Sequence, residues 1–326
     1  MLCRLFHYQK WLSHSRLVAG GPRGVEDEGQ AAVVRKSADS ITAMDMDEKL
    51  PRIGVLSRMT VNWAIEKLQR QYGLADPETG FSALRKASQT HNVKLRSVAA
   101  ALVAAGENTV QRRSRRRGPP PLTFSERGAA AQPNRTHVLH DLLQKVTGLT
   151  GADYGVVQLR DPVHGGLVIE CHHGFGRQIL DHFSYLDDAG TASGTTLARG
   201  SQTFVDDVQT SPIYAHDDRQ VLLAAGVRSV LSTALRHRTG GAYGAVTVHF
   251  AAPHRMPTVL VAERIQQQAD ECARWLRWYD SAAMPRVLAA VHAAARAGKP
   301  SETAPAPRLW PVPSPGSLRA AAVPKP

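Results

Sequence analysis

The chain has 326 residues, 43% of them hydrophobic, which is the composition of a globular protein long enough for two domains. No stretch approaches the roughly 18 apolar residues of a membrane-spanning helix, and the basic N-terminus lacks the apolar run of a signal peptide. The three cysteines are far apart and form no CxxC pair, which argues against a disulfide scaffold or a structural zinc site and favours a reducing compartment. We therefore expect a cytoplasmic protein with no membrane partner.

The formal net charge of +12 is distributed unevenly. Residues 51–118 hold 13 Lys+Arg and 4 Asp+Glu, a net charge of +9, whereas residues 135–280 hold 13 and 15, a net charge of −2. Residues 281–326 hold 6 Lys+Arg and 1 Asp+Glu. Positive charge concentrated beside a slightly acidic region is the pattern of a phosphate-binding module attached to another domain.

The N-terminal 1–50 segment shows no sustained periodicity, so we expect it to be disordered or weakly structured. Residues 53–106 then show apolar residues at helical spacing, with a long first helix ending at Gly73, a short second one over 78–88 and a third over 95–103. The sequence thus predicts a small all-α unit of three helices.

The first helix of this unit has a second apolar stripe, formed by Val61, Ile65, Leu68 and Tyr72. Such a wide apolar face has two interpretations. It is either part of the core of the unit or the seam of a dimer of parallel helices, and we expect it to serve as both.

The remainder of the chain predicts an α+β domain between two irregular segments. Residues 107–134 are rich in Arg and Pro and read as a linker, whose arginine run over 112–117 would bind polyanions without sequence preference. Residues 135–280 alternate between helical and strand patterns, with helices at both ends of an antiparallel sheet and a turn at "GTASGTTLARG". An Ala-rich helix over 281–299 and a disordered Pro/Ala-rich tail over 300–326 follow.

The helical unit resembles the ANTAR domain, a three-helix RNA-binding module of transcription antiterminators that works as a dimer. The resemblance is carried by "LQRQYGL" and by "GFSALRKASQTHNVKLRSVA", which keeps the Phe, Leu-Arg, Ser, Asn, Lys-Leu-Arg and Val-Ala of that family in register. The first helix departs from the family, because Ile65-Glu66 stands where Lys-Gly is usual. The resemblance implies that a dimer binds paired stem-loops in leader transcripts and prevents a terminator hairpin from forming.

The candidate RNA-binding residues are the cations of this unit and one amide. Arginine offers a planar stacking surface and a forked donor, and lysine a point charge for phosphate. The candidates are Arg58, Lys67, Arg70, Arg85, Lys86, Asn92, Lys94 and Arg96. Two alternatives stay open: the basic face is only solvated surface, and Asn92 is instead the N-cap of the third helix.

The α+β region resembles a GAF domain of the actinobacterial sensor type, through "LTGADYGVVQL", "HHGFGRQILDHF", "VLLAAGVRSVLSTAL" and "GAVTVHFAAPHRMP". The order of the two domains is the reverse of the usual one. The resemblance implies a sensory or dimerisation domain, with a pocket for a small-molecule ligand near Tyr154, His173, Phe204 and Tyr214.

No residue pattern indicates catalysis, a cofactor or a metal ion. Cys171, His172 and His173 are adjacent on a strand and point to alternating faces, so they cannot converge on one ion. We expect a regulator and not an enzyme. The rival hypotheses are a DNA-binding helix-turn-helix regulator with a GAF sensor, and a GAF-based ligand or redox sensor with a degenerate ANTAR domain, in which Ser193 or Cys171 would matter.

Overall fold

The computed structural model describes residues 52–105, 118–129, 133–187, 190–236, 241–253 and 256–298, all of which belong to one unit of the chain. The 1–50 segment, the arginine run 112–117 and the 300–326 tail lie outside the described residues. Among the described helices none has the length and apolar content needed to cross a bilayer.

Three helices form the N-terminal region: α3 (Arg52–Tyr72), α4 (Pro77–His91) and α5 (Leu95–Ala104). Gly73 ends α3 with a φ of 62°, a conformation that glycine adopts without strain. Asp76 caps α4, because its Oδ1 accepts a hydrogen bond from the Thr79 amide at 2.7 Å, and Pro77 occupies the first helical position.

Asn92 does not cap the third helix, so that interpretation is wrong. It ends α4 instead, in the left-handed conformation with a φ of 49°, and its amide bonds to carbonyls of the last turn. Asn tolerates this conformation better than other residues with a side chain. Lys94 precedes α5, and no side chain caps that helix.

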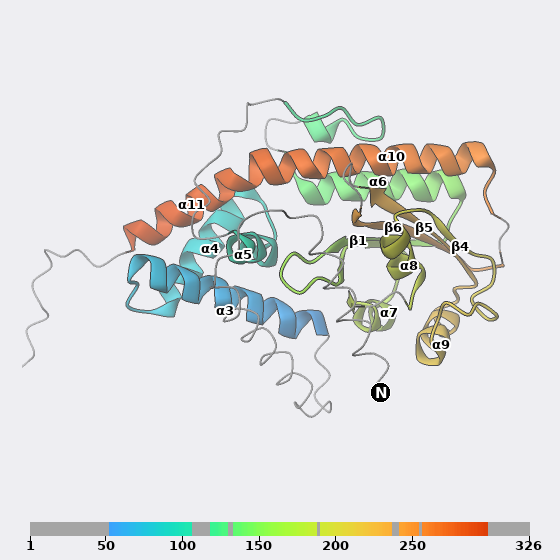
Figure 1. The fold of residues 1–326 in the computed structure, drawn as a ribbon, viewed down its shortest axis with the longest axis horizontal. Coiled ribbons are helices and arrows are strands. Elements are labelled where there is room, and N and C mark those ends of the chain that lie inside the picture. The colour runs from blue at the N-terminus through green and yellow to red at the C-terminus, as the bar shows by residue number, and fades with distance from the viewer. Residues whose placement is uncertain are drawn as a thin grey trace, which may run out of the picture. The chain divides into compact units, whose positions relative to one another are not determined.

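The apolar stripe of α3 is covered within the chain. Leu68 is fully buried and Ile65 is nearly so, among residues of α4 and α5. Tyr72 reaches helix α11 (Met284–Ala297), where its hydroxyl lies 2.9 Å from Nδ1 of His292. α11 packs mainly against α4 (Figure 1). The stripe therefore contributes to the core, and a dimer seam there stays a prediction.

The α+β region is built on a six-stranded antiparallel sheet in the order β3-β2-β1-β6-β5-β4. The strands are β1 (Tyr154–Arg160), β2 (Leu167–His173), β3 (Tyr185–Leu186), β4 (Thr203–Val205), β5 (Ser229–Arg236) and β6 (Ala242–Phe250). The central strands β1, β5 and β6 are buried almost throughout because helices cover both faces of the sheet.

Two long helices, α6 (Arg135–Thr150) and α10 (Val259–Trp278), lie side by side on one face of the sheet (Figure 1). The shorter helices α7 (Arg177–His182), α8 (Ala192–Arg199) and α9 (His216–Ala224) lie on the other. α10 continues through a π-helical turn, η3 (Tyr279–Ala283), into α11. One face thus carries the larger core, and the other face leaves room for a cavity.

Two local predictions were wrong. The stretch "GTASGTTLARG" is not a turn but contains α8, with Thr191 as its N-cap and Gly200 as its left-handed C-cap. Its Ser, Gly and Thr residues, which are typical of turns, are buried against β5 and β6, so tertiary packing overrides their propensity. The stretch "GRQILDHFSYL", whose apolar spacing predicts a helix throughout, is helical only to His182, and Tyr185–Leu186 pairs with β2 instead.

Part of the segment read as a linker packs on the α+β domain. Residues 118–129 include a 3-10 turn, η2 (Arg127–Ala129). Trp275 of α10 donates from Nε1 to the Gly128 carbonyl at 3.0 Å, and Glu271 accepts from Thr123 at 2.8 Å. The predicted fold class, a three-helix domain followed by an α+β domain with a helix-flanked antiparallel sheet, is confirmed.

Candidate nucleic-acid interface and sensor cavity

The eight candidate RNA-binding residues fall into separate groups in the structure. Exposed cations on α3 and α4 form the first group: Arg58, Arg70, Arg85 and Lys86. Arg85 lies over the ring of Phe81, with 5.9 Å between its guanidinium carbon and the ring centroid. Asn92 is exposed at the end of α4, and its carbonyl accepts a hydrogen bond from Asn134 at 3.2 Å.

Lys67 lies apart from the exposed group. Its ammonium donates to the carbonyl of Leu102 at 3.0 Å and to that of Ala105, at the C-terminal end of α5. These carbonyls have no partner within the helix, and a cation is stabilising at this end of the helix dipole. The geometry gives Lys67 a structural role in joining α3 to α5.

Lys94 and Arg96, at the start of α5, face the α+β domain. Lys94 Nζ lies 3.1 Å from the Glu170 carboxylate and 2.6 Å from its backbone carbonyl. Arg96 Nη2 lies 2.9 Å from the same carboxylate and 3.0 Å from the Ile169 carbonyl. Both cations thus bind a side chain and a backbone oxygen of β2.

Glu170 is the centre of a buried cluster of charges. Its side chain is only 7% exposed, and a third cation, Arg135 of α6, lies 3.4 Å from its carboxylate and 2.7 Å from the Ser97 hydroxyl. Burial acts to raise the pKa of Glu170, but the positive charges of Arg135, Arg96 and Lys94 outweigh it and hold this pKa below its usual range. The carboxylate is therefore ionised at neutral pH and satisfied by three donors.

A β-bulge explains how Glu170 reaches these cations. Val157 pairs with Cys171 and Gln158 with Ile169, so Glu170 is the extra residue of β2, opposite no residue of β1. Bulges free backbone groups and redirect side chains. On its other edge β2 pairs with β3 only through Leu167 and Val168. The carbonyls of Ile169 and Glu170 accept hydrogen bonds from Arg96 and Lys94 instead.

A second contact joins α3 to the loop between β1 and β2. The Nε2 atom of His164 lies 2.9 Å from the Thr60 hydroxyl, and the His164 ring lies 5.5 Å from that of Trp63. Burial lowers the pKa of His164 and outweighs the opposing effect of Asp161. Because the Thr60 hydroxyl donates to the Leu56 carbonyl at 2.9 Å, Nε2 of His164 is the donor in this contact.

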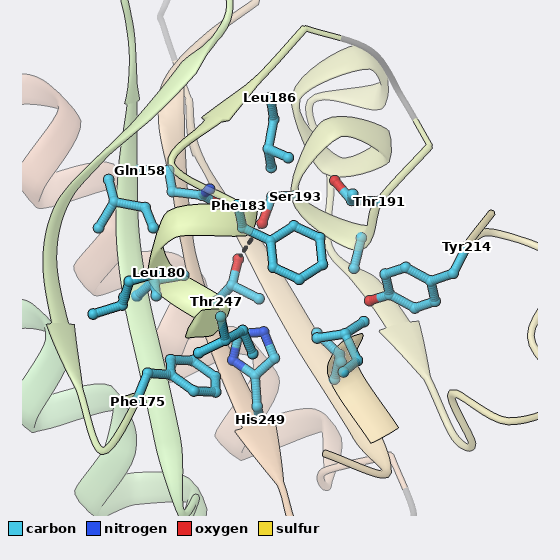
Figure 2. A pocket seen from close by; sticks show the side chains of 16 residues that line it. Gln158, Phe175, Leu180, Phe183, Leu186, Thr191, Ser193, Tyr214, Thr247 and His249 are labelled. Carbon is cyan, nitrogen blue, oxygen red and sulfur yellow. Dashed lines mark hydrogen bonds between the residues drawn. The ribbon is translucent and has the colours of Figure 1, made fainter. Parts of the chain in front are cut away.

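A cavity lies between the sheet and the helices α7 and α8 (Figure 2). It offers about 40 Å³ to the centres of water-sized molecules, and one water needs about 10–15 Å³ by this measure. Apolar and aromatic side chains make most of its wall, together with the polar residues Gln158, Thr191, Ser193, Thr247 and His249. Among the residues that the structure describes, its lining holds no Asp, Glu, Lys or Arg, so an uncharged guest fits best.

His249 is the unsatisfied polar group of this wall. Burial lowers the pKa of its imidazole to about 3, and its buried Nδ1 finds no hydrogen-bond partner among the described residues. The ring packs edge to face on Phe175, with 4.9 Å between centroids (Figure 2). By contrast, Ser193 and Thr247 satisfy each other, their hydroxyl oxygens lying 2.9 Å apart. A ligand that pairs with Nδ1 would remove the cost of leaving this atom unbonded.

Of the four residues that the sequence places near a pocket, Tyr214 lines this cavity. Tyr154 lies behind it, stacked on Phe175 with 4.9 Å between the centroids. His173 is exposed at the end of β2, and Phe204 packs against the larger core. The structure therefore brings one of the four to the cavity wall and a second next to it.

Sequence reasoning missed both Glu170 and His249. The signal for Glu170 was present, because a lone charge in the apolar strand "GLVIECHHG" needs a partner. His249 gave a similar signal as the only ionisable group of "AYGAVTVHF" apart from Tyr243. No pattern in the sequence indicated the β-bulge that directs the Glu170 side chain.

Neither metal nor thiol chemistry gains support from the geometry. No cluster of three His, Cys, Asp or Glu that could hold an ion occurs among the residues that the structure describes. Burial raises the pKa of the Cys171 thiol to about 12 and also raises that of Cys272. Both thiols are thus poor nucleophiles at neutral pH.

Two family models match the chain. The ANTAR domain matches residues 55–103, which cover most of α3, all of α4 and nearly all of α5, and the GAF domain matches residues 134–273. A comparison with curated proteins gave no match.

The solved structures to which the chain shows similarity include three that contain GAF domains. A GAF domain/HD domain protein from Geobacter sulfurreducens is 16% identical, with 46% of this chain and 97% of that chain covered and a TM-score of 0.39. The GAF domain of a phosphoenolpyruvate-protein phosphotransferase from Coxiella burnetii is 15% identical, with 62% of this chain and 95% of that chain covered and a TM-score of 0.39. The blue-light absorbing form of the PixJ GAF domain from Thermosynechococcus elongatus is 13% identical, with 49% of this chain and 93% of that chain covered and a TM-score of 0.36. With both family models in place, the chain carries an ANTAR domain at residues 55–103 followed by a GAF domain at residues 134–273.

Proposed function

We propose that this protein is a cytoplasmic, RNA-binding regulator of transcription antitermination. The observation that carries the proposal is that the ANTAR match covers the three-helix domain, in the part of the chain with the largest excess of positive charge. In this proposal a homodimer binds paired stem-loops of a leader transcript, and holding them prevents a terminator hairpin from forming. The exposed cations Arg58, Arg70, Arg85 and Lys86 make the first contacts with phosphates and bases.

A gel-shift comparison at equal salt tests this function. The full-length chain is titrated onto a two-hairpin RNA and onto a DNA duplex of the same length. We expect tighter binding to the RNA, and a weaker RNA complex for Arg85→Met. Tighter binding to the duplex would favour the helix-turn-helix rival instead.

We further propose that the GAF cavity binds a small uncharged molecule with one polar group. Two features of the described part of the chain support this: a lining without formally charged residues, and the unpaired Nδ1 of His249. Ethanol is a suitable probe for a space of about three waters, with acetate and ethylammonium as charged analogues of similar size. We expect ethanol to bind and to shift the ring resonances of His249. Equal binding of acetate would contradict the proposal.

The rival of a GAF-based redox sensor has less support. Ser193, which lines the cavity, carries a hydroxyl and not a thiol, and it is hydrogen-bonded to Thr247. Cys171 lies on β2, and the pKa of its thiol is raised. We therefore propose a non-enzymatic sensor, in which occupancy of the cavity acts on the ANTAR domain through contacts and not through chemistry.

A further inference from the structure

The cations at the start of α5 are both RNA-binding candidates and ligands of Glu170. Lys94 and Arg96 retain side-chain exposures of 34% and 22%, and their charged ends point to the same carboxylate. A phosphate group and a carboxylate bind such cations through the same kind of charge-assisted hydrogen bond. One ammonium or guanidinium cannot offer the same donors to both at once.

Glu170 also differs from an ordinary surface partner. Surface ion pairs contribute little, because water and salt screen them. Here the carboxylate is 7% exposed and has three cationic partners, and its extra position in the β-bulge directs it at them. The contact is reinforced by backbone carbonyls on the same strand. It is therefore strong enough to compete with an RNA phosphate.

We infer that Glu170 closes the RNA-binding surface: the GAF strand β2 occupies Lys94 and Arg96, and RNA gains these two contacts only when α5 separates from β2. This inference rests on the proposed RNA-binding function. In the closed form the exposed cations Arg85 and Lys86 on α4 can still meet RNA, but Nζ of Lys94 and Nη2 of Arg96 are bonded to β2.

The cavity lies directly behind this contact. The side chain of Ile169 lines the cavity, while its backbone carbonyl accepts the hydrogen bond from Arg96. The neighbouring residue is Glu170, which binds both cations. A shift of Ile169 would therefore also move the Ile169 carbonyl and the neighbouring Glu170 carboxylate, which bind the cations of α5.

The test measures RNA affinity of the full-length chain and of Glu170→Gln, which keeps the size of the side chain and removes its charge. Glu263→Gln is the matched control, because it makes the same change at an exposed site of α10. We expect Glu170→Gln to bind a two-hairpin RNA at least about tenfold more tightly, with a salt dependence steeper by about two phosphate contacts. The control should stay within about twofold of the wild type.

Changing Lys94 and Arg96 to Ala in the Glu170→Gln chain should remove the gain. A gain that survives this change, or a Glu170→Gln affinity equal to that of the wild type, would overturn the inference. Circular dichroism verifies the fold of each variant. Glu170→Asp, which keeps the charge on a shorter side chain, is a second variant expected to show a smaller gain.

Heparin serves as a second polyanion that separates this inference from the proposed function. If no variant binds RNA but Glu170→Gln gains affinity for heparin through Lys94 and Arg96, the closure stands and the RNA function is wrong. If the wild type and Glu170→Gln bind RNA equally well, the function stands and the closure is wrong.

Discussion

Lys94 donates twice to Glu170, to its backbone carbonyl at 2.6 Å and to its carboxylate at 3.1 Å. The two residues belong to different domains, the ammonium preceding an ANTAR helix and the carboxylate lying in a bulge of a GAF strand. A residue that the sequence marks for RNA is thus bound to the sensor domain. The following predictions test the consequences of this arrangement.

Replacement of Glu170 by Gln should lower the free energy of unfolding at pH 7. The loss of a buried, ionised partner leaves three cations with a weaker acceptor, and because these cations are partly exposed we expect a cost of about 1–3 kcal/mol. The pKa of Glu170 is lowered in the folded chain, so its contribution is present above the ordinary pKa of about 4.3 and is lost as the pH falls through the folded value. The difference between wild type and variant, measured by urea unfolding, should be constant from about pH 6 to 8 and shrink below about pH 4. An unchanged difference at low pH would contradict the depressed pKa.

His249 should remain neutral throughout the physiological range. Burial lowers its pKa to about 3 in the folded chain, whereas an unfolded histidine titrates near 6.5. Stability is therefore full above about pH 6.5 and falls with acidification, by up to about 1.4 kcal/mol per pH unit from this residue. His249→Phe should flatten that slope, although His164 and His292, whose pKa values are also lowered, still contribute. NMR titration of the ring is the measurement, and a midpoint near 6.5 would show that the ring is not buried.

Lys67 and Arg85 should respond differently to replacement by Met. Lys67 donates to the carbonyls that end α5, so Lys67→Met should cost about 1 kcal/mol of stability. It should change RNA affinity less than twofold. Arg85 is exposed, so Arg85→Met should leave stability within about 0.5 kcal/mol and reduce the salt dependence of RNA binding by about one contact. Thermal melts and gel shifts of both variants distinguish these outcomes, and the reverse pattern would show that Lys67 is the RNA ligand.

Gly244 on β6 should not tolerate a side chain. A Cβ atom there would collide with the Gln158 carbonyl and lie 2.8 Å from the Leu159 Cα, and neither backbone group can move without breaking the β1–β6 pairing. We expect Gly244→Ala to cost about 3 kcal/mol or more.

Gly148 is the matched control for this substitution. It lies in α6 and is exposed, with no atom near a new Cβ, so Gly148→Ala should stabilise the chain by about 0.5–1 kcal/mol. Chemical denaturation measures both, and equal effects of the two substitutions would contradict the close approach of β6 to β1.

The regular parts of the fold were predictable because local periodicity determines them. The three ANTAR helices and the main GAF strands follow from apolar spacing, with Gly73 and Pro77 marking the ends. The helix α8 was missed because its small polar residues favour turns in isolation and are helical only when packed on β5 and β6. The sequence suggested Asn92 as an N-cap of the third helix, whereas its left-handed backbone conformation places it at the end of α4.

The candidate sites were less predictable than the fold because they depend on contacts between distant residues. Lys94 and Glu170 are 76 positions apart, and no local pattern shows that a bulge aims one at the other. The cavity wall likewise combines residues from β1, β6, α8 and the loops before α7 and α9. The family resemblance indicated which domain contains the pocket. The residues that form the pocket wall could be identified only from the folded structure.

Crosslinking the protein to RNA in cells and sequencing the bound fragments tests the central claim most directly. The wild type is compared with Glu170→Gln and with a full-length variant in which Arg85, Lys94 and Arg96 are Ala. If the protein regulates transcripts and Glu170 closes its RNA-binding surface, the recovered fragments are enriched in leader regions with paired stem-loops. Glu170→Gln then recovers more RNA than the wild type, and the triple variant loses this RNA. The claim would be contradicted if neither the wild type nor Glu170→Gln recovered more RNA than the triple variant.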